Sequence, residues 1–152
     1  MSSYIIWISV FAAIIHILEE YYYGWIDWAK SFVPTVKKSH FIVVNILFVF
    51  TCVLAAILQF TELKISIFSL LIINTIVHLV PTIIKGKYSP GLASAILLYI
   101  PIGVFGYLAT FNENIASNVQ LIVGTLLGFI IMAIPFLFQF LYGRMTPPPP
   151  RL

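Results

Sequence analysis

The sequence predicts an all-α integral membrane protein, a bundle of five transmembrane helices with a short interfacial helix after the first. Of the 152 residues, 61% are hydrophobic and only 9% are charged, and the mean hydropathy is +1.07. A soluble domain carries about 25% charged residues, so lipid must be the main solvent here. The apolar segments are also close to the ~20 residues that a helix needs to cross a bilayer. We expect one transmembrane domain over residues 1–145 and a proline-rich cytoplasmic tail over residues 146–152.

The first predicted span, residues 4–22, ends in a run of tyrosines, which favour the headgroup level of a membrane. The following stretch, residues 24–38, is too polar to span. Trp25, Trp28 and Phe32 recur there at helical spacing on one side, ahead of Pro34. This pattern predicts a short helix that lies in the interface and ends before the proline.

Polar, turn-forming residues separate the four remaining apolar segments. A kink is expected near Pro101, because proline lacks the N–H of a regular helix. Gly124 and Gly128 have the spacing of a helix-packing motif and predict either packing within the bundle or a homodimer. The later predicted spans cover residues 40–60, 65–84, 92–111 and 119–142.

The distribution of Lys and Arg predicts the orientation in the cell membrane, since short cytoplasmic loops are enriched in both. With five spans, seven of these residues fall on one side and only Lys64 on the other. We therefore expect the amino terminus outside and the carboxyl terminus in the cytoplasm. The seven are Lys30, Lys37, Lys38, Lys85, Lys87, Arg144 and Arg151.

Several polar residues are predicted to share one layer in the cytoplasmic half of the membrane. A charge near the bilayer centre costs about 2.5–3.5 kcal/mol, so such residues usually face a protein interior and find partners there. Spacings of three and four residues can place the members on each helix along one face. They are His16, Glu19 and Glu20 on the first span, Asn45 on the second, Asn74 and His78 on the third, and Tyr99 on the fourth.

The pattern His-x-x-Glu-Glu at residues 16–20, followed by an Asn and by His-x-x-Pro at residues 78–81, resembles the HXXEE-domain membrane proteins. The resemblance covers most of the hydrophobic chain. It implies a multi-pass membrane protein with suspected enzymatic activity, and it supports the choice of these residues without naming a reaction.

The first hypothesis for the polar layer is a metal site. His16, Glu20 and His78 form a ligand set that suits zinc, iron or manganese, with Asn45 and Asn74 orienting the ligands. The order of these residues matches neither the zincin motif nor that of the di-iron bundles.

The second hypothesis is metal-free acid–base catalysis. Adjacent Glu19 and Glu20 in a low-dielectric pocket should titrate apart, so that one can hold a proton and a histidine can relay it. Tyr99 could donate a hydrogen bond. Either hypothesis predicts an enzyme acting on a lipid-like or isoprenoid substrate that enters from the membrane.

Two further interpretations remain open. Intramembrane His and Glu also mark proton and metal-ion pathways, and a buried polar network can simply hold helices together. His40 is expected at the interface and Gln139 is a weaker candidate for the site. The net charge of +3 is spread over the ends of apolar segments, so membrane lipids rather than nucleic acid are the expected partners.

Overall fold

The computed structural model describes residues 2–112 and 115–145, with only the backbone described for residues 140 and 142–145. Throughout this part of the chain, regular structure is helical, and five helices are long and apolar enough to cross a membrane. The predicted fold class is therefore confirmed. The elements are α1 (Ser2–Tyr22), α2 (Trp25–Lys30), α3 (Lys38–Leu58), α4 (Thr61–Lys85), α5 (Leu92–Ser94), η1 (Ala95–Tyr99), α6 (Ile100–Asn112) and α7 (Asn118–Met145).

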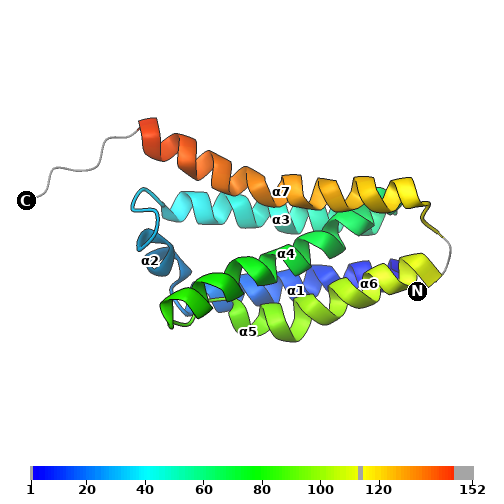
Figure 1. The fold of residues 1–152 in the computed structure, drawn as a ribbon, viewed down its shortest axis with the longest axis horizontal. Coiled ribbons are helices and arrows are strands. Elements are labelled where there is room, and N and C mark those ends of the chain that lie inside the picture. The colour runs from blue at the N-terminus through cyan, green and yellow to red at the C-terminus, as the bar shows by residue number, and fades with distance from the viewer. Residues whose placement is uncertain (1, 113–114, 146–152) are drawn as a thin grey trace, which may run out of the picture.

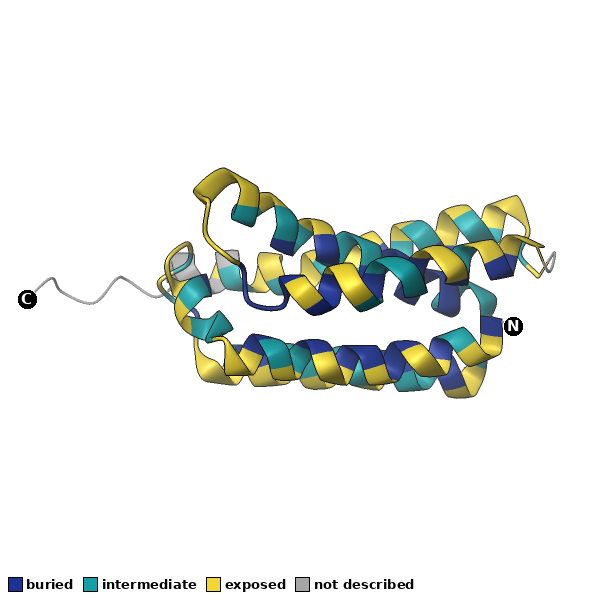
Figure 2. Cartoon of the chain, turned by 90° about the horizontal axis from the view of Figure 1, so that it is seen from below, coloured by how far each residue is buried: buried dark blue, intermediate teal, exposed yellow. Residues whose placement is uncertain are grey.

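Helix α4 is the central element of the bundle. It crosses diagonally between α7 on one side and α6 on the other, while α1 packs against α3 and α6 (Figure 1). Residues 59–60 alone separate α3 from α4, yet α4 packs mainly against α7 and α6. Buried residues line the inward faces of the helices and exposed apolar residues their outer faces (Figure 2). Exposed leucine, isoleucine and phenylalanine on the outside are what a lipid-facing bundle requires.

Gly124 and Gly128 lie against α4 of the same chain. A Cβ on Gly124 would be 2.7 Å from Cβ of Ile65, and a Cβ on Gly128 would be 2.6 Å from the Ser66 carbonyl oxygen. The close helix approach predicted from their spacing is thus made within the bundle. A homodimer would need another surface than these two glycines, and homodimerisation itself stays a prediction.

The fourth span, Leu92–Asn112, is irregular at its start. It begins after Gly91, which has φ +96°, and passes through the π turn η1 before continuing as α6. The irregularity expected at Pro101 thus appears one turn earlier, as a π turn of the kind often found at functional sites. The predicted tail over residues 146–152 lies outside the described residues.

Candidate metal centre

Two imidazoles and one carboxylate converge between α1 and α4. Nε2 of His78 lies 3.4 Å from Oε1 of Glu20, and Nε2 of His16 lies 3.6 Å from the same oxygen. One potential ligand atom from each residue lies within 4.8 Å of the others. His16 and His78 are 2% exposed and Glu20 is 6% exposed. Such a group in the interior needs partners for its charge and its nitrogen lone pairs.

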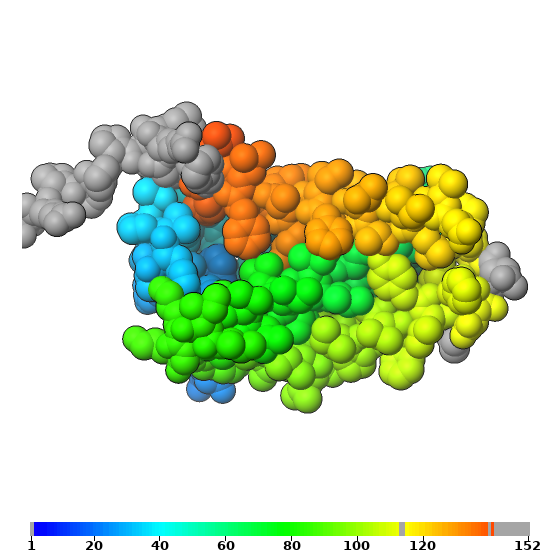
Figure 3. Space-filling model, in the orientation of Figure 1, coloured from blue at the N-terminus to red at the C-terminus, as the bar shows by residue number. Residues whose placement is uncertain are grey.

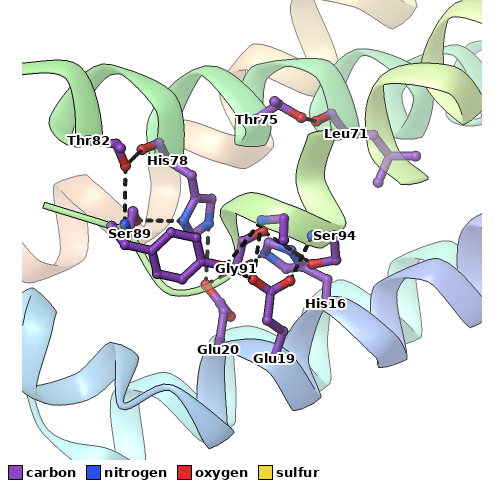
Figure 4. Close-up of polar contacts among 12 residues, drawn as sticks. His16, Glu19, Glu20, Leu71, Thr75, His78, Thr82, Ser89, Gly91 and Ser94 are labelled. Atoms are coloured by element: carbon purple, nitrogen blue, oxygen red, sulfur yellow. Dashed lines mark hydrogen bonds and ion pairs between the residues drawn. The ribbon is translucent and has the colours of Figure 1, made fainter. Parts of the chain in front are cut away.

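Helical geometry brings these three side chains together. His16 and Glu20 are four residues apart on α1, so they stack along its inner face. His78 approaches from α4 on the other side, and the segment that joins α4 to α5 closes the gap between them (Figure 4). Trp28 of α2 lies over His78, with 6.4 Å between ring centroids. Helix α2 therefore covers one end of the cluster.

A serine hydroxyl holds the second nitrogen of each imidazole. Oγ of Ser94 lies 2.9 Å from Nδ1 of His16, and Oγ of Ser89 lies 2.9 Å from Nδ1 of His78. Oγ of Ser94 also lies 3.2 Å from the Gly91 carbonyl oxygen, and when its hydrogen is donated there, Nδ1 of His16 is the donor to Ser94. The lone pair of neutral His16 then resides on Nε2, a buried atom that has no hydrogen-bond partner.

Gly91 forms the floor beneath the three side chains. A Cβ there would lie 2.7 Å from Cε1 of His16, 2.9 Å from Cγ of Glu20 and 2.9 Å from Cε1 of His78. Its φ of +96° is also a conformation that residues with a Cβ rarely adopt. The backbone can therefore approach the cluster this closely only at a glycine.

Glu19 lies beside the cluster, but its carboxylate binds the start of the fourth span (Figure 4). Its carboxylate accepts hydrogen bonds from the backbone N–H of Ala93 at 3.2 Å and of Ser94 at 2.7 Å, and from the hydroxyl of Tyr88. Burial, together with the bond to Glu19, raises the pKa of Tyr88 to about 12, so its hydroxyl keeps its proton and donates. Glu19 thus satisfies N–H groups that a helix start leaves unpaired.

A cavity of about 130 Å³ adjoins the cluster and is lined by His16, Glu20 and His78. The space-filling view shows a recess in this region, where α4, α7 and the segment from α2 to α3 meet (Figure 3). Polar side chains from four other positions also line it. They are Asn45, Asn74 and Gln139, joined by His40.

Residues 7–106 match the family described as "Protein of unknown function with HXXEE motif". The chain belongs to this HXXEE family. It is also similar to Uncharacterized protein YrkK of Bacillus subtilis (strain 168), with 39% identity over 72 residues. These residues are 45% of this chain and 46% of the relative, so the match spans about half the length of each. No solved structure matches the chain.

In this HXXEE chain, the structure brings most of the predicted site residues together. His16, Glu20 and His78 form the cluster, and Asn45 and Asn74 line the adjoining cavity. Tyr99 packs on the ring of His16 at 4.5 Å between centroids, but it is not among the residues that line the cavity. Glu19 is held by the N–H groups of Ala93 and Ser94, and its catalytic role stays a prediction.

Sequence reasoning missed the part of the site that the α4–α5 segment supplies. The sequence predicts only turn-forming residues between the third and fourth spans, yet Ser89, Gly91 and, just beyond, Ser94 contact the histidines. The glycine directly before a predicted membrane helix was an available signal for a close backbone approach. The pairing of each serine with its histidine depends on tertiary structure alone.

Proposed function

We propose that this HXXEE protein is a membrane-embedded enzyme that uses a divalent metal ion, with zinc as the first choice, on a lipid-like substrate. The observation that carries the proposal is the convergence of His16, Glu20 and His78 on one point beside a cavity. The three residues would be the ligands, and the cavity would supply the open position that catalytic metal sites keep.

The distances in the cluster fit a tetrahedral zinc ion. Zinc bonds of about 2.0–2.2 Å at tetrahedral angles place two ligand atoms about 3.3–3.6 Å apart. The two Glu20–histidine distances, 3.4 and 3.6 Å, fall in this range, and all three ligand atoms lie within 4.8 Å of one another. The partnerless Nε2 of His16 and the serines on both Nδ1 atoms also fit, because metal-bound histidines usually have their other nitrogen held in this way.

A bound ion of this kind supplies Lewis acidity, which polarises a substrate oxygen or lowers the pKa of a water. The protein's own residues would do the rest. Asn45 and Asn74 would hydrogen-bond to the substrate in the cavity, and the apolar walls would exclude bulk water. Trp25, another lining residue, belongs to α2 and would help close the cavity at the interface.

Metal-free acid–base catalysis is a second candidate, favoured by the contact of one carboxylate oxygen with both imidazoles. In that case Glu20 would exchange a proton with His16 or His78, and Tyr99 would support the ring of His16. Isomerisation or cyclisation of an isoprenoid needs this kind of proton transfer in an apolar cavity.

We also propose that the cavity lies in the cytoplasmic half of the cell membrane. The end of the bundle that carries α2 and the α4–α5 segment holds Lys30, Lys85 and Lys87, whereas the connection at the other end, between α3 and α4, is close to Lys64. The excess of Lys and Arg at the first end supports a cytoplasmic location.

The zinc content of the purified protein tests the proposal. The wild-type chain, loaded with zinc and desalted, should retain about one ion per chain. His16→Ala, His78→Ala and Glu20→Gln should each retain much less, because three protein ligands are the usual minimum of a catalytic site. The matched control is His40→Ala, which removes the remaining histidine of the chain, a residue that lines the same cavity outside the cluster.

Retention of zinc by all three cluster variants would overturn the metal proposal. Absence of zinc from the wild-type chain, with loss of function in Glu20→Gln, would favour the metal-free candidate. If the variants lowered only thermal stability, the cluster would be a packing network. Zinc or proton flux in proteoliposomes would favour transport over catalysis.

A further inference from the structure

Two residues that line the cavity beside the cluster each have a buried atom that lacks a hydrogen-bond partner. The atoms are Oδ1 of Asn74 on α4 and Oε1 of Gln139 on α7. A buried polar atom without a partner lowers the stability of the fold by about 1–3 kcal/mol. A ligand that donates hydrogen bonds to both oxygens would remove this cost.

The hydrogen bond between Gln139 and His40 explains why the Gln139 oxygen is left over. Nε2 of Gln139 donates to Nδ1 of His40 across a distance of 2.9 Å. This bond joins α7 to α3 and fixes the amide with its oxygen unpaired. Asn74 and Gln139 therefore offer acceptors, and a hydroxyl group is the simplest neutral donor that a ligand can present to them.

The charges of the lining select against an anionic head group. None of the described residues that line the cavity is a lysine or arginine, and Glu20 is among them. At Asn74 and Gln139, a phosphate or carboxylate would face two amide oxygens, and an anion has no hydrogen to donate to these acceptors. The ligand head group that fits this part of the cavity is neutral and carries a hydroxyl.

The cavity is too small for a whole lipid. Its volume of about 130 Å³ is slightly below that of an engineered cavity of about 150 Å³ that holds benzene. A separate groove of about 520 Å³ runs along α3 beside α1, and it can take a chain. The groove and the cavity share Phe41 and Asn45, and aliphatic side chains such as Ile17, Ile46, Val49 and Val53 line the groove.

We propose that the HXXEE protein binds a single-chain lipid alcohol, with its hydroxylated head on Asn74 and Gln139 and its apolar chain in the groove between α1 and α3. This inference names the substrate class for the proposed function and rests on that function only in treating the bound molecule as a substrate. Asn45, at the junction, marks where the polar head meets the chain.

Retention of dodecanol by the protein in lipid nanodiscs, before any zinc is added, tests the inference, with empty nanodiscs as background; the same samples are loaded with zinc afterwards. Dodecanoate and dodecylamine are the matched probes with an anionic and a cationic head. Dodecanol should be retained most. Asn74→Leu and Gln139→Leu should each weaken its binding about tenfold, the effect of one lost hydrogen bond. The matched control is Gln120→Leu. Gln120 is on α7 like Gln139, but its Nε2 donates to Oε1 of Glu62 at 2.9 Å.

A second pair of variants tests the groove. Ile46 and Ile57 are both on α3 and are 62% and 61% exposed, but only Ile46 lines the groove. Ile46→Trp should fill the groove and lower dodecanol retention several-fold, and Ile57→Trp should leave it unchanged. Because both residues face outward, neither variant should prevent folding.

Equal retention of the three probes, or preference for dodecanoate or dodecylamine, would overturn the inference. So would equal effects of the Ile46 and Ile57 variants, or undiminished dodecanol binding in both leucine variants. Zinc content, measured on the same samples, reports separately on the proposed metal site. A chain that binds zinc but not dodecanol would refute only the lipid-alcohol inference.

Discussion

The two neighbouring glutamates of the HXXEE motif have different partners, because adjacent positions on an α-helix point about 100° apart. Glu20 faces the two imidazoles, whereas Glu19 accepts the N–H groups of Ala93 and Ser94. The motif therefore combines a residue that would bind the metal with a residue that fixes the segment beneath it. Two adjacent glutamates thus allow one turn of α1 to serve both purposes.

Gly91 gives the sharpest test at the residue scale. Gly91→Ala should abolish zinc retention and lower the apparent melting temperature, since the new Cβ would lie within 3 Å of all three cluster side chains. The matched control is Gly86→Ala, where φ is +61° and no atom lies within 4 Å of the added Cβ. That variant should keep its zinc. Its free energy of unfolding should fall by only about 1–2 kcal/mol, the cost of a left-handed conformation for a residue with a Cβ. Equal zinc retention in both variants would show that Gly91 does not support the cluster.

The cluster itself could be predicted from the sequence, but its support could not. The four-residue spacing of His16 and Glu20 fixes a common face, and the expected depth of His78 places it in the same layer. The separation of Glu19 from Glu20 was open to prediction from helical rotation, yet we placed both on one broad face. The contacts of Ser89 and Ser94 could not be foreseen, because they require the fold of the α4–α5 segment around the cluster.

At the scale of elements, the start of the fourth span depends on a neighbouring helix rather than on its own residues. Gly91 provides no side-chain cap, and Glu19 of α1 accepts the N–H groups of Ala93 and Ser94 in its place. The spans were predictable from hydropathy, with ends within a few residues. The π turn η1 was not, since hydropathy carries no signal for a π turn within an apolar span.

Glu19→Ala should therefore loosen this start. We expect hydrogen exchange at the amides of Ala93 and Ser94 to rise by about tenfold or more, because bonds to a charged acceptor contribute about 1.5–3 kcal/mol. Exchange measured by mass spectrometry on the peptide that contains both amides checks this. Glu62→Ala, which removes a carboxylate bonded to Gln120, is the control and should leave that peptide unchanged. Unaltered exchange in Glu19→Ala would contradict the capping role.

At the scale of the whole molecule, the site lies at one end of a bundle whose outer surface is apolar. The helices α1, α3, α4 and α7 each contribute to the cavity, so the site depends on the complete arrangement rather than on one motif. The number of spans and the short α2 could be predicted from composition and periodicity. The central position of α4 could not, because neither short connections nor hydropathy specify which helices pack together.

The proposed orientation can be measured with introduced cysteines. A membrane-impermeant maleimide should label Ser117→Cys in intact cells and Lys37→Cys only after permeabilisation, as the Lys and Arg distribution predicts. Both positions are exposed, and the native Cys52 is fully buried and should not react. The reverse labelling pattern would place the cavity in the outer half of the membrane.

X-ray absorption spectroscopy at the zinc edge of the loaded, purified protein tests the central claim most directly. We predict two imidazole nitrogens and at least one oxygen at about 2.0–2.2 Å, with a much weaker zinc edge in His78→Ala and an unchanged spectrum in His40→Ala. A spectrum with a sulfur ligand at about 2.3 Å, or one without imidazole scattering, would show that His16, Glu20 and His78 do not bind the metal.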